Sequence, residues 1–283
     1  MPVLNTETKD QDSFVIKLSG VNFSYNSYQA LNNIDLNVRH GAYLGVVGPN
    51  GSGKTTLAYI MAGILRPTTG TVETFGNNVG LVLTNPENQI VSLVVEDDIA
   101  FGPENLGLDA QQILDRVERS LKITGCPELR KSLVTILSGG QIAQVAFAGQ
   151  LAMDAEIIIL DEGTSLMDSK AKSTLLEFLR FLNTEQSKTI IHISHKLDDL
   201  YAADEVVFLL DGEIKAKATG ALELLRYFKD TVGAYVRPGS FLLYRSFLEE
   251  MGLGDMDERQ ATHGLVQGMA WRQVSGKVQR RKS

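Results

Sequence analysis

One segment restricts the fold of this chain more than any other: a glycine-rich loop that joins a short apolar run to a helical pattern. Residues 42–47 form the apolar run expected of a buried strand, and Gly48-Pro49-Asn50-Gly51-Ser52-Gly53-Lys54-Thr55-Thr56 follows directly. The loop matches the pattern G-x-x-x-x-G-K-[ST] in full, and residues 55–65 continue as a helix. A strand, this loop and a helix in that order predict an α/β fold with a phosphate-binding site at the end of the strand.

Each part of the loop has its own role in holding a phosphate chain. The backbone amides of residues 50–54 would surround the β-phosphate, and the Lys54 ammonium would reach the β- and γ-phosphates. The Thr55 hydroxyl is placed to bind Mg²⁺, and the Thr56 hydroxyl would lie near the α-phosphate. The predicted nucleotide-binding residues of the loop are Asn50, Gly51, Ser52, Gly53, Lys54, Thr55 and Thr56.

A second glycine-rich segment, Leu137-Ser138-Gly139-Gly140-Gln141, precedes another predicted helix, over about residues 141–153. The unpaired amides and the dipole of a helix N-terminus attract anions, and the two glycines let a phosphate approach closely. Taken alone, the segment also fits an ordinary helix start that contains glycine.

Two further strands end in residues suited to hydrolysis. The apolar run Ile157–Leu160 ends in Asp161 and Glu162, so both carboxylates are expected at the ligand-binding edge of the sheet. There Asp161 would hold Mg²⁺ through water, and Glu162 would polarise the water that attacks the γ-phosphorus. The strand over residues 189–194 ends at His195, which can donate a hydrogen bond to the γ-phosphate. The alternative for the two carboxylates is a pair of strand-end groups that only face solvent.

The order of these motifs resembles that of the ATP-binding-cassette (ABC) ATPases over residues 14–220. The motifs are, in chain order, Tyr25, the phosphate loop, the LSGGQ segment at residues 137–141, the carboxylate strand, residues 165–168 and His195. The stretches Asn85–Gln89 and Val95–Gly107 are similar to the ATPases of energy-coupling-factor importers. The resemblance implies an α/β, P-loop NTPase fold of the ABC ATPase type. Such a fold has a mainly parallel sheet, an inserted helical subdomain and a small C-terminal helical appendage.

The resemblance also implies a division of the chain. A flexible tail over residues 1–12 would precede an ABC ATP-binding domain over residues 13–220, with its helical subdomain over about residues 96–140. Residues 221–283 would form the appendage, a candidate dimerisation region. An apolar stripe there either joins the two ATPases or packs on the appendage's own core; it consists of Phe241, Tyr244, Leu248 and Met251.

Several further roles come from the resemblance alone. Tyr25 would stack on adenine, although its alternation with Phe23 also fits packing within a strand. Residues 165–168 would cross a dimer interface, and residues 85–106 would grip a helix of a membrane partner or form a plain loop. The signature residues would complete the ATP site of a neighbouring subunit; they are Ser138, Gly139, Gly140 and Gln141.

One departure from the family concerns the chemistry. The family places a glutamine that touches Mg²⁺ and the attacking water where this chain has Thr84. Thr84 can reach the metal through a water, but it orients the nucleophile less well, and errors near 1 Å can cost about a hundredfold in rate. We therefore keep a second hypothesis, in which this chain is the weaker hydrolase of an asymmetric pair.

The function implied by the resemblance is ATP hydrolysis that powers import of a vitamin or a transition-metal ion, with ATP and Mg²⁺ bound. The implied partners are a second ABC ATPase, identical or different, a transmembrane coupling subunit and a substrate-binding membrane subunit. No run approaches the length of about 18 apolar residues that a membrane helix needs, so we expect a peripheral protein on the cytoplasmic face. The net charge of −7 argues against nucleic acid as a partner, although soluble ABC proteins of translation and repair remain the alternative class.

Overall fold

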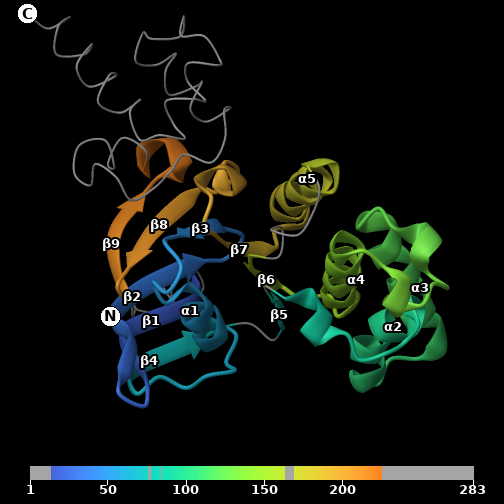
Figure 1. Ribbon diagram of the computed structural model, residues 1–283, viewed down its shortest axis with the longest axis horizontal. Coiled ribbons are helices and arrows are strands. Elements are labelled where there is room, and N and C mark those ends of the chain that lie inside the picture. The colour runs from blue at the N-terminus through green and yellow to red at the C-terminus, as the bar shows by residue number, and fades with distance from the viewer. Residues whose placement is uncertain (1–13, 76–77, 84, 163–168, 225–283) are drawn as a thin grey trace, which may run out of the picture.

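The computed structural model describes residues 14–75, 78–83, 85–162 and 169–224. A lobe built on two sheets lies on one side, and a helical lobe lies on the other (Figure 1). The strands are β1 (Phe14–Tyr25), β2 (Tyr28–Arg39), β3 (Tyr43–Val47), β4 (Thr69–Thr74), β5 (Val79–Val82), β6 (Ile157–Asp161), β7 (Thr189–Ser194), β8 (Glu205–Leu210) and β9 (Glu213–Ala218). The α-helices are α1 (Lys54–Met61), α2 (Val95–Asn105), α3 (Ala110–Ile123), α4 (Gly139–Ala152) and α5 (Ser169–Gln186). Short 3₁₀ helices are η3 (Pro86–Gln89), η4 (Pro127–Leu129), η5 (Val134–Ile136) and η6 (Leu197–Leu200).

The central sheet has six strands in the order β5-β6-β7-β3-β8-β9, and only β9 runs antiparallel to its neighbour. Strands β3, β6 and β7 are buried along their whole length, as continuous apolar runs in a parallel sheet require. Val47 pairs with Ser194, so the strand that leads into the glycine-rich loop ends beside the strand that leads to His195. The predicted mainly parallel α/β sheet is confirmed.

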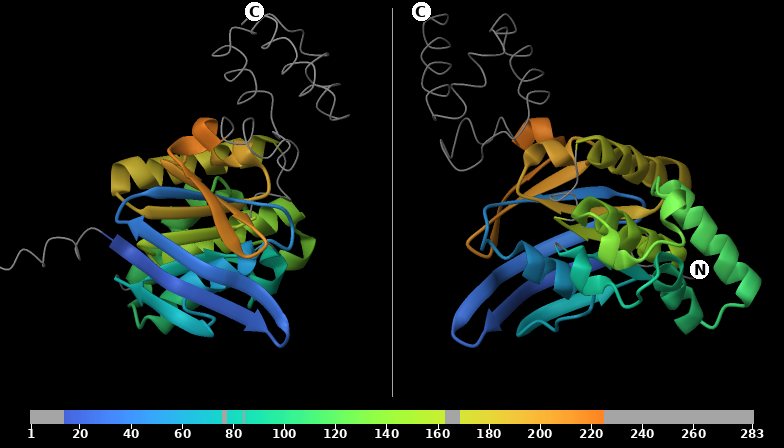
Figure 2. Two further views of the ribbon diagram at one scale, coloured as in Figure 1. Left: turned by 90° about the vertical axis from the view of Figure 1, so that its left-hand side faces the viewer. Right: turned by 45° about the vertical axis from the view of Figure 1, so that its right-hand side comes forward.

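Helix α1 packs against one face of this sheet. Its apolar side chains share a buried cluster with alternate residues of β3, β6 and β7 and with the inner face of an antiparallel sheet in the order β2-β1-β4. Strand β2 alternates buried and exposed residues along much of its length, because only one of its faces meets this core. The two sheets therefore enclose α1 (Figure 2).

Helix α5 covers the opposite face of the central sheet. Leu175, Leu176, Leu179 and Leu182 pack there against the other alternate residues of β3, β6, β7 and β8. Phe147 of α4 belongs to the same cluster, so α4 contacts the sheet lobe as well as its own lobe. The middle of α4 is thereby packed against the sheet lobe, while Ile142 near its start belongs to the core of the helical lobe.

The helical lobe has a core of its own between α2, α3 and α4. Asp109 begins α3 in a reciprocal pair with Gln112, in which its side chain accepts from the Gln112 amide and the Gln112 side chain accepts from the Asp109 amide. Val117 and Leu121, which lie four residues apart as expected for one face of a helix, are buried. The helical subdomain expected between the phosphate loop and the carboxylate strand is thus present.

Three helices differ in length from the predictions. Helix α1 ends at Met61 instead of continuing to residue 65, because Gly63 takes the left-handed conformation, with φ of 73°. Helix α4 starts two residues early because Ser138 caps it. Helix α5, which the sequence predicts over residues 173–182 as a crossover between two strands, extends beyond both of these bounds.

Several predictions concern residues outside the described ranges. They are the tail over residues 1–12, Thr84, the interface loop over residues 165–168 and the apolar stripe beyond residue 240. Within the described part of the chain, no helix is both long and apolar enough to cross a membrane.

Candidate active site

A cavity of about 330 Å³ lies in front of the N-terminus of α1. The hairpin between β1 and β2, the glycine-rich loop, the first turn of α1 and the residue after β6 all contribute to its wall. The lining residues are Tyr25, Tyr28, Ala30, Asn50, Gly51, Gly53, Lys54, Thr55, Thr56 and Glu162. The structure therefore brings Tyr25 and Glu162, which are distant in the sequence, to the loop that was predicted to bind phosphate.

The first turn of α1 is left open toward this cavity. Gly53 caps the helix with φ of 101°, and no side chain caps the helix amides. A Cβ atom on Gly53 would lie 2.5 Å from the Ala30 carbonyl oxygen, so glycine is required both by the backbone angle and by the lack of space. An uncapped helix N-terminus that faces a cavity is an anion-binding arrangement.

Lys54 lies at the floor of the cavity with its ammonium held by backbone oxygens. Its Nζ donates to the carbonyl oxygens of Gly48 and Pro49, each at 3.0 Å. Burial lowers the pKa of Lys54, while the nearby carboxylates of Glu162 and Asp161 oppose that shift. A bound phosphate would add further negative charge beside this buried cation, where its electrostatic effect is strong.

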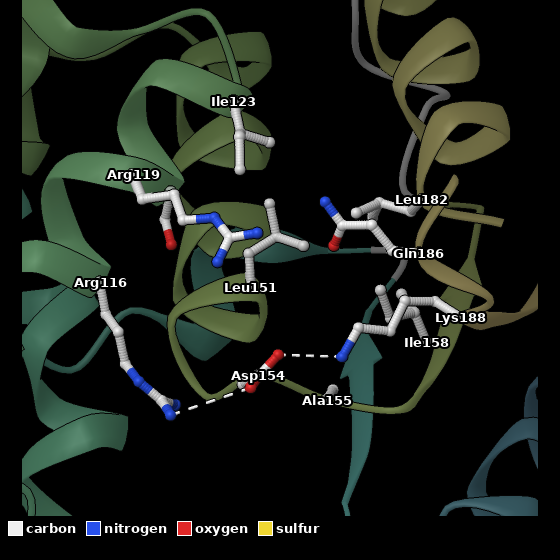
Figure 3. A pocket seen from close by; sticks show the side chains of 11 residues that line it. Arg116, Arg119, Ile123, Leu151, Asp154, Ala155, Ile158, Leu182, Gln186 and Lys188 are labelled. Atoms are coloured by element: carbon white, nitrogen blue, oxygen red, sulfur yellow. Dashed lines mark hydrogen bonds and ion pairs between the residues drawn. The ribbon is translucent and has the colours of Figure 1, made fainter. Parts of the chain in front are cut away.

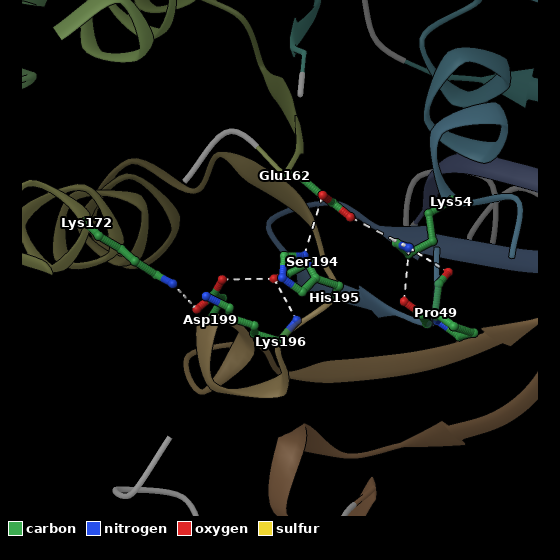
Figure 4. A network of polar contacts seen from close by, with 9 residues as sticks. Pro49, Lys54, Glu162, Lys172, Ser194, His195, Lys196 and Asp199 are labelled. Atoms are coloured by element: carbon green, nitrogen blue, oxygen red, sulfur yellow. Dashed lines mark hydrogen bonds and ion pairs between the residues drawn. The ribbon is translucent and has the colours of Figure 1, made fainter. Parts of the chain in front are cut away.

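Glu162 connects the lysine to the histidine. One carboxylate oxygen lies 3.7 Å from Lys54 Nζ, and the other lies 3.5 Å from His195 Nδ1 (Figure 4). Glu162 has φ of 53°, in the left-handed region that few residues other than glycine adopt. Its amide is held by the Ile193 carbonyl at 3.0 Å. The backbone is thus strained at the residue assigned to catalysis, as often occurs in active sites.

The histidine at the end of β7 differs from the histidine inside it. The His195 side chain is 40 % exposed and faces Glu162. His192 is fully buried, its Nδ1 lies 3.1 Å from the Tyr43 hydroxyl, and burial lowers its pKa to about 4. His192 is therefore a neutral core residue, as its place within the strand predicts.

Two tyrosines flank the hairpin turn between β1 and β2, and only Tyr25 was predicted from the sequence to contact the nucleotide. Tyr25 is 45 % exposed, lines the cavity and makes an edge contact with Phe23 at 4.8 Å between ring centroids, so its ring both borders the cavity and packs within the strand. Tyr28 pairs with Tyr25 in register, and its hydroxyl donates to the Gly51 carbonyl at 3.2 Å. Two aromatics three residues apart at a hairpin turn were the available signal for Tyr28.

The signature segment lies elsewhere. Ser138 caps α4, its Oγ accepts from the Gln141 amide at 3.3 Å, and the Gln141 side chain accepts from the Ser138 amide at 2.9 Å. Among the described residues, those lining the cavity include none of the four signature residues, Ser138 to Gln141. Their expected binding role therefore requires a nucleotide held by another molecule.

Two of the three predicted metal-binding residues lie within the described ranges, one in the cavity wall and one at the end of β6. Thr55 lines the cavity and is exposed, and Asp161 is buried at the end of β6. Thr84 lies outside the described residues. No group of three or more His, Cys, Asp and Glu side chains within the described ranges could hold a metal ion, so a metal here would need oxygen ligands from the nucleotide and from water.

Comparisons with known proteins agree with this geometry. Residues 31–165 match the model of the family described as "ABC transporter". Over 203 residues the chain is 40% identical to the energy-coupling factor transporter ATP-binding protein EcfA of Syntrophomonas wolfei, covering 67% of this chain and 74% of the relative.

Two solved structures are also similar. One is cbiO1 from Clostridium perfringens, described as part of the ABC transporter complex cbiONQ; its TM-score is 0.68 at 28% identity, covering 78% of this chain and 96% of that chain. The other is the dimeric, post-hydrolysis state of the ATP-binding cassette MJ0796 bound to ADP and Pi. It has a TM-score of 0.67 at 26% identity and covers 72% of this chain and 98% of that chain.

Proposed function

The chain belongs to the ABC transporter ATPases, in the energy-coupling-factor branch, and from this premise we propose that its cavity is the site where ATP is bound and hydrolysed to power an importer. Membership of this family implies ATP hydrolysis coupled to transport. The transported solute, a vitamin or a transition-metal ion, is our inference from the branch of the family. One observation supports the site most strongly: Lys54, the glycine-rich loop, Glu162 and His195 converge at the open end of α1.

Each residue then has a defined task in the reaction. The loop amides and the Lys54 ammonium bind the β- and γ-phosphates and neutralise charge that develops on the leaving phosphate oxygen. Glu162 polarises the attacking water, whose oxygen forms a bond to the γ-phosphorus while the bond to the β-phosphate oxygen breaks, giving ADP and phosphate. His195 donates a hydrogen bond to the γ-phosphate from the side of Glu162 that faces away from Lys54.

Mg²⁺ fits the residues at this site. It prefers oxygen ligands and is usually held by one or two protein groups together with substrate phosphates and water. The exposed Thr55 hydroxyl and the Asp161 carboxylate at the end of β6 are such groups, and we propose that they hold it, with Thr84 contributing through a water. When bound, the ion would supply charge neutralisation at the phosphate oxygens.

A second ATPase subunit is needed for the proposed cycle. The Ser138–Gln141 helix start contributes nothing to the lining of the chain's own cavity, and its proposed role is to close over the γ-phosphate of a nucleotide bound by the partner. Binding of two nucleotides between such subunits would close the pair, and hydrolysis would reopen it. The dimeric state of the similar cassette MJ0796 supports this proposal.

We further propose that residues 85–106 dock on a transmembrane coupling subunit, which acts with a substrate-binding membrane subunit, and that the chain works at the cytoplasmic face of the membrane. Four large apolar side chains are exposed in or beside α2, as a docking surface requires. They are Val91, Leu93, Phe101 and Leu106. Copurification tests this assignment, because a membrane protein and a second ATPase in the isolated complex support it, whereas bound rRNA or DNA would contradict it.

The central experiment removes only the charge of the proposed base. Glu162→Gln should leave nucleotide affinity within about twofold, lower the hydrolysis rate by a factor of about a hundred or more, and accumulate an ATP-bound dimer. Glu156 provides a matched control. Glu156 is exposed and directly precedes β6, whereas Glu162 directly follows the same strand. Glu156→Gln should hydrolyse ATP at the wild-type rate, and unchanged hydrolysis in Glu162→Gln would remove Glu162 from its role.

Thr84 supports a second candidate, a weakly hydrolysing subunit of an asymmetric pair. If the missing glutamine limits the reaction, Thr84→Gln should raise turnover in the assembled complex. A variant that is no faster, or a homodimer with a hydrolysis rate typical of the family, would contradict this candidate.

A further inference from the structure

Behind the cavity, a second group of polar side chains holds the backbone on both sides of His195. The Ser194 hydroxyl donates to Asp199 Oδ2 at 2.8 Å and accepts from the Lys196 amide at 3.0 Å (Figure 4). Asp199 belongs to η6, five residues after Ser194. Residues 194 and 196 are therefore tied to one another and to η6, and His195 is the residue between them.

The carboxylate of Asp199 is also fixed from the other side. Lys172 in the first turn of α5 forms an ion pair with Asp199 Oδ1. Its side chain is 22 % exposed, and that of Asp199 is 5 % exposed. A buried carboxylate is costly unless it is paired, so the loss of Lys172 would remove a cation that stabilises the Asp199 charge.

The two oxygens of Asp199 thus connect separate parts of the fold. Oδ1 faces α5 and Oδ2 faces the end of β7. The position of residues 194–196, which we call the histidine turn, is therefore coupled to the start of α5. His195 itself is partly exposed, and its Nδ1 lies 3.5 Å from the Glu162 carboxylate, farther than in a normal hydrogen bond. The side chain therefore depends on its backbone for its position toward Glu162.

We propose that Asp199, held by Lys172, is a positioning residue for ATP hydrolysis, which fixes the turn that presents His195 to Glu162 and the γ-phosphate. The proposal rests on the hydrolytic function proposed above. Asp199 lies on the far side of Ser194 from the cavity and acts through the backbone. A small displacement of His195 reduces the rate without removing any group that binds the nucleotide, and a misplacement of about 1 Å can cost about a hundredfold.

The test compares four variants of the full-length chain in the complex in which it is isolated. Asp199→Asn and Lys172→Met should lower kcat by about ten- to a hundredfold, while KM for ATP and nucleotide affinity stay within about twofold. Ser194→Ala, which removes the link between Asp199 and the Lys196 amide, should have a similar but smaller effect. Lys172→Arg preserves the ion pair and should restore kcat to within about threefold of wild type.

A matched control lies at the opposite end of the same strand. Lys188 directly precedes β7 and forms an ion pair with Asp154 at 2.9 Å (Figure 3), far from the histidine turn in the order of the strand. Lys188→Met also removes a lysine–aspartate ion pair, although Asp154 is 61 % exposed whereas Asp199 is 5 % exposed, and it should leave kcat unchanged. Equal kcat in Lys172→Met and Lys188→Met, or a parallel rise in KM, would overturn the proposal.

A second readout separates this proposal from the proposed function. The side-chain ¹⁵N signals of His195, identified by their loss in His195→Gln, should shift in Asp199→Asn and Lys172→Met and stay unchanged in Lys188→Met. Unshifted His195 signals in Asp199→Asn would overturn the positioning role even when the wild type hydrolyses ATP normally. A wild-type complex that hydrolyses no ATP would instead contradict the proposed function, and the His195 signals would still decide whether Asp199 positions the turn.

Discussion

Helices α1 and α4 both begin in glycine-rich segments that were expected to bind phosphate, and their N-termini are built in opposite ways. Helix α1 starts after Gly53 in the left-handed conformation, without a side-chain cap and with a cavity in front of it. Helix α4 starts directly after Ser138, whose hydroxyl accepts a hydrogen bond from the Gln141 amide and whose amide donates one to the Gln141 side chain. None of these residues lines the cavity. The N-terminus of α1 leaves its amides open to a ligand in the cavity of the same chain, whereas the N-terminus of α4 is hydrogen-bonded within its own helix.

A third helix helps to interpret this difference. Helix α3 begins with the same reciprocal cap, formed by Asp109 and Gln112, although nothing in its sequence indicates a phosphate site. The cap at α4 is therefore first of all a structural device that stabilises a helix end. What distinguishes α4 is the pair of glycines that follows Ser138, and we propose that they let an anion from outside the chain approach this helix end.

The largest effect should come from the cation at the open end. Lys54→Met should weaken ATP binding by about a hundredfold or more, because it removes the charge that faces the phosphates and the side-chain donor to the Gly48 carbonyl oxygen. Titration with a fluorescent ATP analogue measures this. Nearly wild-type affinity in Lys54→Met would show that α1 is not the nucleotide-binding end.

A smaller loss of nucleotide affinity is expected from a side chain that forces the backbone of the same loop to move. Gly53→Ala places a Cβ atom 2.5 Å from the Ala30 carbonyl oxygen at φ of 101°, so the loop must shift, and nucleotide affinity should fall more than tenfold. Gly51→Ala is the control, since Gly51 also has positive φ, of 80°, but its Cβ would have nothing within 4 Å. Isothermal titration of both variants separates the steric effect from backbone strain, and equal losses would argue against the close approach as the cause.

The hairpin aromatics should affect affinity moderately. Tyr25→Ala should weaken ATP binding by about tenfold if the ring stacks on adenine, since such stacking is worth about 1–3 kcal/mol. Tyr28→Phe keeps the ring and removes only the hydrogen bond to Gly51, so we expect a change of less than about threefold. Affinity for ATP and for inorganic triphosphate should be measured together, because an equal loss for both ligands would favour packing over stacking.

The smallest expected effect is the loss of stability when either of the two helix caps, at α3 or α4, is removed. Ser138→Ala and Asp109→Ala should each lower the free energy of unfolding by about 1 kcal/mol in urea titrations. Only Ser138→Ala should also reduce hydrolysis in the assembled complex, since only that cap is proposed to meet a nucleotide. Equal hydrolysis in both variants would reduce the signature to a helix cap.

Much of this arrangement could be predicted from the sequence because it follows from local patterns. The buried runs before Gly48, Asp161 and His195 predicted strands of a mainly parallel sheet, and the structure places these three strands side by side. Asp109, a residue type that commonly caps helices, indicated the start of α3. The chain's membership of the ABC transporter ATPases, predicted from its ordered motifs, is confirmed by the comparisons.

Other features depend on contacts between distant segments and could not be predicted. Tyr28 meets the glycine-rich loop only because the β1–β2 hairpin folds over it. The ion pair between Lys172 and Asp199 joins α5 to η6, and neither residue belongs to a motif. Sequence patterns gave the start of α1 correctly but extended its end, since the effect of Gly63 depends on its left-handed conformation.

The most direct test of the difference between the two helix ends measures nucleotide binding and dimer formation in the same sample. In the Glu162→Gln background, Ser138→Arg places a bulky cation at the start of α4 without changing the cavity at α1. We predict wild-type affinity for ATP and no ATP-driven dimer in light scattering, with the chain alone or with the ATPase subunit that copurifies with it. Loss of ATP binding in Ser138→Arg, or a dimer that forms as in the parent, would contradict the account.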